Sequence, residues 1–243
     1  MVEAHSISHT PHASWCQICV AGGGKSDHHK DAEKKPTPLA AMDYQYMSAT
    51  GEACGDERQA KALALTVSDC DIGDFATNQV EKKGKDDFAI SFASSFLDRM
   101  RAAEVRVRYD NEPGLVQLVK AIRDFRHPRV TILEPISRAE HEQVGSAERS
   151  HGISQTQCRK LRLDFKARSK EDIVPGHPLF AHMLRHGGFL HQKFQPRART
   201  GHTAHESRTG TTYQSPLVPY GELVMLRVPS TLLDYARSST PSG

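Results

Sequence analysis

The chain has 243 residues, of which 37% are apolar and 25% charged, and these values suit one core domain of ordinary size with smaller appendages. No stretch approaches the roughly 18 apolar residues of a membrane span, and the N-terminus lacks a signal peptide's apolar region, so we expect an intracellular protein without a membrane partner. The formal net charge of +3 is too small to indicate a nucleic-acid partner by itself, and an odd number of cysteines, five, argues against a disulfide framework.

The first twenty residues contain a set of candidate zinc ligands, which are His5, His9, Cys16 and Cys19. In structural sites, Zn²⁺ prefers four such nitrogen and sulfur ligands in tetrahedral geometry. We therefore predict a small zinc-binding segment over residues 1–20. The alternative is a chance grouping, because the chain has 14 histidines.

Residues 21–37 are rich in Gly, Lys, His and Asp and carry almost no large apolar side chain. Such a segment buries too little surface to offset the entropy that it loses on ordering, so we interpret it as a linker. The core domain is then expected to span residues 38–190.

Three strands are predicted at the start of the core, over residues 39–47, 63–67 and 75–80. Asp69, Asp71 and Gly73 form the turn between the last two strands, and we interpret the two acids as turn formers rather than metal ligands. Asp43 interrupts the apolar first strand, where an ionised carboxylate is costly to bury without a cation or a partner. An apolar helical stripe over residues 86–102 follows and is best explained by core packing.

The next predicted strand ends in a second acidic residue, Asp110. Residues 105–108 alternate apolar and basic side chains, which is the period of a half-buried strand, and the Asn-Glu-Pro-Gly sequence at 111–114 breaks it. A carboxylate at the carboxyl end of a strand lies where open α/β sheets bind ligands, although Asp also opens turns. A helix over residues 115–125 and a strand over 129–133 complete an α/β fold, with a mixed five-stranded sheet and helices on both faces.

The third candidate acid, Glu148, lies early in a helix predicted from about Ser146, and 37 residues separate it from Asp110. From Arg149 to Lys170 the chain has seven Lys or Arg residues and one acidic residue, Asp164. A basic helix face beside a catalytic acid would hold phosphates in a salt-sensitive manner, and the alternative is an ordinary solvated face. The candidate DNA-binding residues are Arg149, His151, Gln155, Arg159, Lys160 and Arg162.

The C-terminal part of the chain, residues 191–243, is predicted to be a basic loop followed by a truncated strand region. Before it, a helix is expected over residues 179–184, with Gly187-Gly188 as its end. Residues 195–212 are rich in Arg, Thr, Gly and His, which indicates an exposed loop, and the apolar pattern over 220–228 predicts a strand.

Five short motifs carry a resemblance to a known family. They are Trp15-Cys16-Gln17-Ile18-Cys19-Val20, Met42-Asp43-Tyr44, Tyr109-Asp110-Asn111-Glu112-Pro113, Gly145-Ser146-Ala147-Glu148-Arg149 and Pro219-Tyr220-Gly221-Glu222. In this order they resemble the catalytic core of retroviral and retrotransposon integrases, the ribonuclease H-like D-D-E polynucleotidyl transferases, and most closely the copia-like kind. One departure is Val144, which stands where the family has the Asn of an Asn-Gly pair.

The resemblance implies a ribonuclease H-like fold, an N-terminal His-His-Cys-Cys zinc module, and a homo-oligomer that acts on duplex DNA ends and target DNA. It also implies that Asp43, Asp110 and Glu148 are catalytic and hold two Mg²⁺ (or Mn²⁺) ions, which prefer oxygen ligands. Such a protein would be nuclear when it acts on chromosomal DNA.

The implied reaction is an in-line displacement at phosphorus, in which water gives DNA end processing and a DNA 3′-hydroxyl gives strand transfer. Two alternatives stay open, a catalytically degenerate nucleic-acid-binding remnant of a transposon and a nuclease of the same fold that only hydrolyses. The sequence has neither a Gly-x-Ser-x-Gly elbow nor a Gly-x-x-x-x-Gly-Lys phosphate loop, which disfavours serine hydrolases and the common nucleotide hydrolases.

Overall fold

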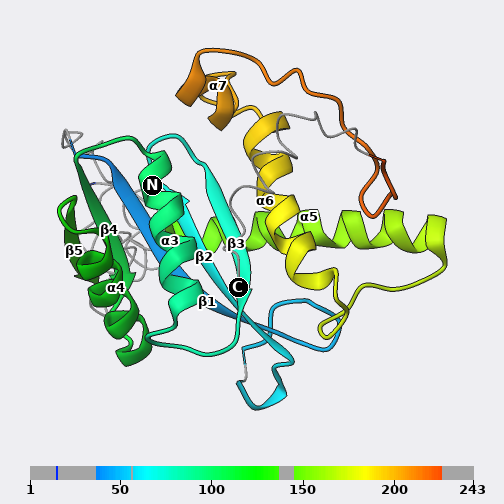
Figure 1. Cartoon of the computed structure of the whole chain (residues 1–243), viewed down its shortest axis with the longest axis horizontal. Helices are drawn as coiled ribbons and strands as arrows, with labels where there is room; N and C mark the ends of the chain where they lie inside the picture. The colour runs from blue at the N-terminus through cyan, green and yellow to red at the C-terminus, as the bar shows by residue number, and fades with distance from the viewer. Residues whose placement is uncertain (1–14, 16–36, 56, 137–144, 226–243) are drawn as a thin grey trace, which may run out of the picture. The chain divides into compact units, whose positions relative to one another are not determined.

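The computed structural model describes residue 15 and residues 37–55, 57–136 and 145–225 (Figure 1). The chain divides into two units, Met1–Pro36 and Thr37–Gly243, and every element described below lies in the second unit. The predicted zinc ligands and residues 21–36 of the predicted linker lie outside the described residues, so both remain predictions.

Five strands form one mixed sheet in the order β3-β2-β1-β4-β5. The strands are β1 (Leu39–Met47), β2 (Ala62–Asp69), β3 (Phe75–Val80), β4 (Glu104–Asp110) and β5 (Val130–Ile136). β1, β2 and β3 pair antiparallel, whereas β1, β4 and β5 pair parallel. The helices are η1 (Glu57–Gln59), α3 (Asp87–Arg99), α4 (Pro113–Arg126), α5 (Gly145–Ser169), α6 (Phe180–Phe194) and α7 (Ala204–Thr209).

Helices cover both faces of the sheet. α3 and α4 pack on one face, against a core that includes Met42 of β1, Val67 of β2 and Val107 of β4. On the other face, Ala147 of α5 packs with Ala41 and Ile136, and α5 then continues past β3 (Figure 1). The predicted α/β fold, a mixed five-stranded sheet with helices on both faces, is confirmed. This is the ribonuclease H-like order of elements that the resemblance implies.

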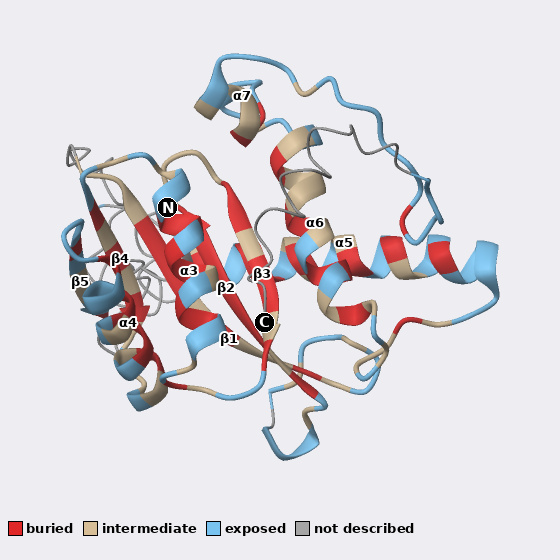
Figure 2. Cartoon of the chain, in the orientation of Figure 1, coloured by how far each residue is buried: buried red, intermediate tan, exposed pale blue. Residues whose placement is uncertain are grey.

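Alternation along the strands decides which side chains face α5. In β4, Val105, Val107 and Tyr109 are buried on the α3 and α4 side, while Arg106, Arg108 and Asp110 are only partly buried on the other (Figure 2). Successive side chains of a strand point to opposite faces, so Arg106, Arg108 and Asp110 share the α5 side of the sheet. The sheet therefore presents Asp110 to the helix that carries Glu148.

Two phenylalanines of α3 and α4 lie at the surface, and the first of them belongs to the predicted core stripe over residues 86–102. Phe88 of α3 is 50% exposed and Phe125 of α4 is 62% exposed, whereas Phe96 is buried. The ring of Phe88 stacks on that of Phe92 at 6.4 Å, so this edge of the helical stripe packs on itself. The buried part of the stripe is narrower than its apolar residues suggest.

α6 extends through the two glycines that were predicted to end it. A Cβ atom at Gly188 would lie only 3.1 Å from the carbonyl oxygen of Phe75, so the missing side chain lets α6 approach β3. Gly187 and Gly188 are both buried. The prediction of a break at this point is wrong, because Gly188 allows close packing of α6 on β3 and Gly187 faces Gln157 and Cys158 of α5.

The region after α6 also differs from its prediction. Thr203 and Glu206 form a capping box that starts α7 within the predicted loop. Residues 220–225 contain a turn and no strand, and Leu223 and Met225 are 94% and 98% exposed. Tyr220 instead packs into a core between α5 and α6, so for this part of the predicted strand the prediction is wrong.

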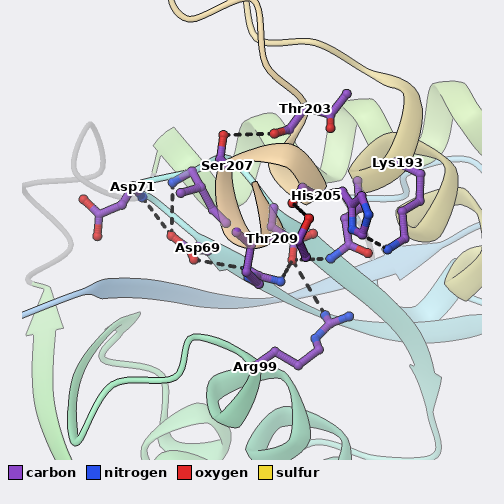
Figure 3. Close-up of polar contacts among 12 residues, drawn as sticks. Asp69, Asp71, Arg99, Lys193, Thr203, His205, Ser207 and Thr209 are labelled. Carbon is purple, nitrogen blue, oxygen red and sulfur yellow. Dashed lines mark hydrogen bonds and ion pairs between the residues drawn. The ribbon is translucent and has the colours of Figure 1, made fainter. Parts of the chain in front are cut away.

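α7 is attached to the sheet by charged side chains (Figure 3). Arg208 donates to Asp74 Oδ2 at 2.7 Å and lies 3.4 Å from Asp69 Oδ2, while Gln192 of α6 donates to the same Asp74 oxygen at 2.8 Å. Asp69 therefore serves the fold, and its Oδ1 atom accepts the N–H groups of Asp71 and Ile72 as a turn former does. None of the helices in the described part of the chain has the length and apolar content to span a membrane.

Candidate active site

Two of the predicted catalytic acids lie on adjacent parallel strands. Ala41 pairs with Arg108 and Met42 with Tyr109, so the next position of this register sets Asp43 of β1 beside Asp110 of β4. Neighbouring strands are about 4.8 Å apart, and both side chains point to the α5 face. The sheet thus brings Asp43 and Asp110 to adjacent positions, and the resemblance implied that these acids share one site.

The start of α5 brings the third acid to the same face. Ala147 packs against Ala41 and Ile136, and the hydroxyl of Ser146 lies 3.4 Å from that of Ser68 on β2. These small side chains let the helix lie close over β1. Glu148, in the first turn of α5, is exposed, and its charge contributes to the raised pKa of Asp43.

The pKa of Asp43 is raised, in part by the charges of the other acids. Burial is the main cause that raises the pKa of Asp43 to about 7, and the charges of Asp110, Glu112 and Glu148 raise it further. The N–H group of Tyr44 donates to Asp43 Oδ1 at 2.8 Å and opposes this rise of the pKa. Several carboxylates that repel one another in this way are stabilised by a cation.

Glu112 joins the cluster, although it was not predicted as a site residue. It lies two residues after Asp110, at the N-cap of α4, and its side chain makes no cap hydrogen bond. Lys83 pairs with it at 2.6 Å. Its place in the turn directly after the strand that ends in Asp110 was the signal in the sequence.

His151 lies against Asp43 rather than at the outer surface of α5. The His151 side chain is buried, and its Nδ1 atom is 3.8 Å from Asp43 Oδ2. Burial lowers the pKa of His151 to about 4, and a backbone contact with Asp43 acts in the opposite direction. Because burial favours the neutral form of both groups, this is a contact of dipoles and not an ion pair.

The other predicted DNA-binding residues have different surroundings. Arg149 and Lys160 are exposed, and Gln155 is half-buried. Arg159 pairs with Glu52 at 3.2 Å, and Arg162 pairs with Asp172, which Lys166 also contacts at 2.9 Å. Part of the basic face is thus neutralised within the chain. The assignment of all six residues to DNA remains a prediction.

The donor chemistry of the site fits Mg²⁺ or Mn²⁺, because carboxylate oxygens are the ligands that these ions prefer. Among the described residues, however, no three His, Cys, Asp or Glu side chains are gathered closely enough to hold a metal ion. Asp43 and Asp110 supply an adjacent pair, and the charges of Glu112 and Glu148 both reach Asp43. The acids do not line the cavity of about 650 Å³ between α3, β3 and α6, so this candidate site is separate from that hollow.

No protein-family model and no curated protein matches the sequence. Solved structures similar to the chain include retroviral integrases at low sequence identity. The HTLV-2 integrase catalytic core domain in complex with magnesium (trimeric form) is 12% identical with a TM-score of 0.48, over 71% of this chain and 97% of that chain. The simian T-cell lymphotropic virus intasome in complex with PP2A regulatory subunit B56 gamma is 12% identical with a TM-score of 0.49, over 93% and 80%. The BIV integrase catalytic core is 12% identical with a TM-score of 0.45, over 71% and 93%.

Proposed function

We propose that the chain is an integrase-like enzyme core that binds DNA and catalyses metal-dependent phosphoryl transfer. The observation that carries the proposal is the placement of Asp43 and Asp110 on adjacent parallel strands, with Glu148 at the start of the helix over them. Asp110 lies at the carboxyl end of β4, where such sheets usually bind ligands, and Asp43 lies beside it within β1. The raised pKa of Asp43 supports a site that a cation would stabilise.

In this proposal, Asp43, Asp110 and Glu148 hold Mg²⁺ or Mn²⁺. When bound, two such ions supply activation of the attacking oxygen and charge stabilisation of the leaving oxygen in an in-line displacement at phosphorus. The chain's own part is to fix two acids on the rigid sheet and the third on α5. Water as the attacking group gives end processing, and a DNA 3′-hydroxyl gives strand transfer.

Arg149 and Lys160 supply the first phosphate contacts in this proposal, because both are exposed on the helix that carries Glu148. Arg159 and Arg162 reach DNA by exchanging Glu52 and Asp172 for phosphate. Such contacts position DNA without reading its sequence, so sequence preference is expected to be low. We further propose that the working form is a homo-oligomer, nuclear when it acts on chromosomal DNA.

A catalytically degenerate nucleic-acid-binding protein is the second candidate. The observation in its favour is that three ligands do not already converge among the described residues. Preorganised ligands are what an efficient metal enzyme needs.

The test is a strand-transfer and nicking assay on labelled duplex DNA with Mg²⁺ or Mn²⁺, comparing the chain with Asp110→Asn. Joined products that the substitution abolishes support the integrase function, and metal-dependent nicks alone support a hydrolysis-only nuclease. Absence of any product from a folded chain that binds DNA would leave the degenerate binding protein. Circular dichroism of both proteins controls for folding.

A further inference from the structure

The face of α5 that packs on the sheet is formed mainly by small and polar side chains. Ala147, Ser150, Ser154 and Cys158 are buried there together with His151. Of these, His151 is the one whose ring contacts a candidate catalytic acid, at 3.8 Å from its Nδ1 atom to Asp43 Oδ2. The imidazole therefore contacts a candidate catalytic acid in addition to packing between α5 and the sheet.

The Asp43 carboxylate is contacted at both oxygens. Oδ1 accepts the N–H group of Tyr44 at 2.8 Å, and Oδ2 faces the His151 ring. The terminal torsion of an Asp side chain has broad preferences, so its carboxylate turns easily unless neighbours hold it. The hydrogen bond from Tyr44 on one side and the His151 ring 3.8 Å away on the other restrict how far the Asp43 carboxylate can turn.

His151 also connects two of the three acids. It lies three residues after Glu148, and residues with this spacing are neighbours on one side of a helix. The His151 side chain belongs to the helix that carries Glu148, and its ring contacts Asp43 of β1. It therefore forms a contact between α5 and β1. This contact adds to those of Ala147 and Ser146, which also hold the start of α5 against the sheet.

We propose that His151 is a positioning residue that holds the Asp43 carboxylate in the orientation needed for metal binding. This inference rests on the proposed function, because it assigns Asp43 to a divalent cation. Groups behind a ligating carboxylate commonly alter metal affinity by about 10-fold or more when they are removed. The role needs the ring nitrogen facing Asp43, and the volume of the side chain alone does not fulfil it.

Two substitutions separate the nitrogen from the volume. His151→Leu keeps most of the packing volume and removes the polar atom. His151→Asn keeps a polar atom at the place of Nδ1, because the Asn side-chain nitrogen is the same number of bonds from Cα. Ser154→Ala is the matched control, since Ser154 is buried one turn later on the same face of α5.

The measurement is Mn²⁺ binding to the whole chain without DNA, followed by electron paramagnetic resonance, with Asp43→Asn as the reference for loss of the site. We expect His151→Leu to weaken Mn²⁺ binding about 10-fold, His151→Asn to retain most of the affinity, and Ser154→Ala to match the natural chain. Thermal unfolding of each variant shows whether it is folded. A general packing role would instead lower the unfolding temperature without this order of affinities.

Equal Mn²⁺ affinities in the natural chain and in His151→Leu would overturn the positioning role and leave the proposed function standing. Mn²⁺ binding that Asp43→Asn does not alter would overturn the proposed function, and the inference with it. If His151→Leu fails to fold, His151→Gln replaces it, because the Gln amide lies one bond farther from the backbone. Equal affinities for the Asn and Gln variants would then overturn the inference.

Discussion

Arg208 Nη1 lies 2.7 Å from Oδ2 of Asp74, a side chain with no exposed surface, although the two residues are 134 positions apart. The pair joins α7 to the residue that directly precedes β3. Removing one partner of a buried pair leaves the other charge uncompensated, which commonly costs several kcal/mol. The attachment of α7 is therefore a structural part of the domain.

Arg208→Ala is expected to lower the free energy of unfolding by about 3 kcal/mol, because Gln192 and the more distant Arg99 would be left to compensate Asp74. Urea denaturation followed by circular dichroism measures the loss. Arg123→Ala is the control, since Arg123 and its partner Asp124 are 49% and 68% exposed, and it should cost less than about 1 kcal/mol. Equal losses of unfolding free energy in the two variants would contradict a structural role of the Arg208–Asp74 pair.

Gly188→Ala should destabilise the chain by about 1–3 kcal/mol, because its Cβ atom would meet the Phe75 carbonyl oxygen at 3.1 Å. The matched variant is Gly152→Ala in the exposed part of α5, where a Cβ atom has nothing within 4 Å. Alanine has the higher helix propensity, so this variant should gain about 0.5–1 kcal/mol. The unfolding temperature should fall in Gly188→Ala and rise in Gly152→Ala. A higher unfolding temperature in Gly188→Ala would refute the close packing of α6 on β3.

The order of strands and helices could be predicted because local patterns decide it. Val105 and Val107 alternate with arginines in β4, and the register of adjacent strands then places Asp43 by Asp110. The capping box of Thr203 and Glu206 was also a local signal that could have located α7. The position of Asp43 beside Asp110 therefore follows once the pairing of their two strands is known.

The surroundings of α5 could not be predicted in this way. Helical spacing puts His151 and Arg159 on one side of the helix, but the sheet covers the first and leaves the second exposed. The buried stripe contains Ser150 and Ser154 in place of large apolar residues, so hydrophobic periodicity does not reveal it. The partners Asp172 and Arg208 likewise depend on tertiary packing, which no local pattern encodes.

The Cys158 thiol should be unreactive in the folded chain. Burial raises its pKa to about 12 from the ordinary 9.0, so the thiolate that reacts is rare at pH 8. Because the folded-state pKa is the higher one, the stabilising effect is complete below pH 9.0 and is lost as the pH rises toward 12. The stability difference between the natural chain and Cys158→Ala should therefore shrink from pH 8 to pH 10.

Labelling with iodoacetamide at pH 8, read by peptide mass spectrometry, checks the first part of this prediction. Cys70 is partly exposed and should react before Cys158. Cys158 should be labelled at the rate of the other cysteines only after urea unfolds the chain. Rapid labelling of Cys158 in the folded chain would show that the core between α5 and α6 is open.

Asp172→Asn is expected to strengthen DNA binding. Hydrogen bonds from Arg162 and Lys166 hold the pKa of Asp172 well below its usual range, so this acid is ionised and occupies both cations at neutral pH. Its neutralisation frees these side chains for phosphate, and each added phosphate contact steepens the dependence of log affinity on log salt concentration by roughly 0.9.

Fluorescence anisotropy of labelled duplex DNA, titrated at several salt concentrations, measures both the affinity and this slope. Asp124→Asn makes the same change of charge on α4, where Arg123 is its partner, and serves as the control. If both variants gain the same affinity and slope, the effect comes from net charge alone and the Arg162 side of α5 does not contact DNA. A steeper slope in Asp172→Asn only would identify Asp172 as an internal competitor of the DNA backbone, because the added contacts then arise where its two partners lie.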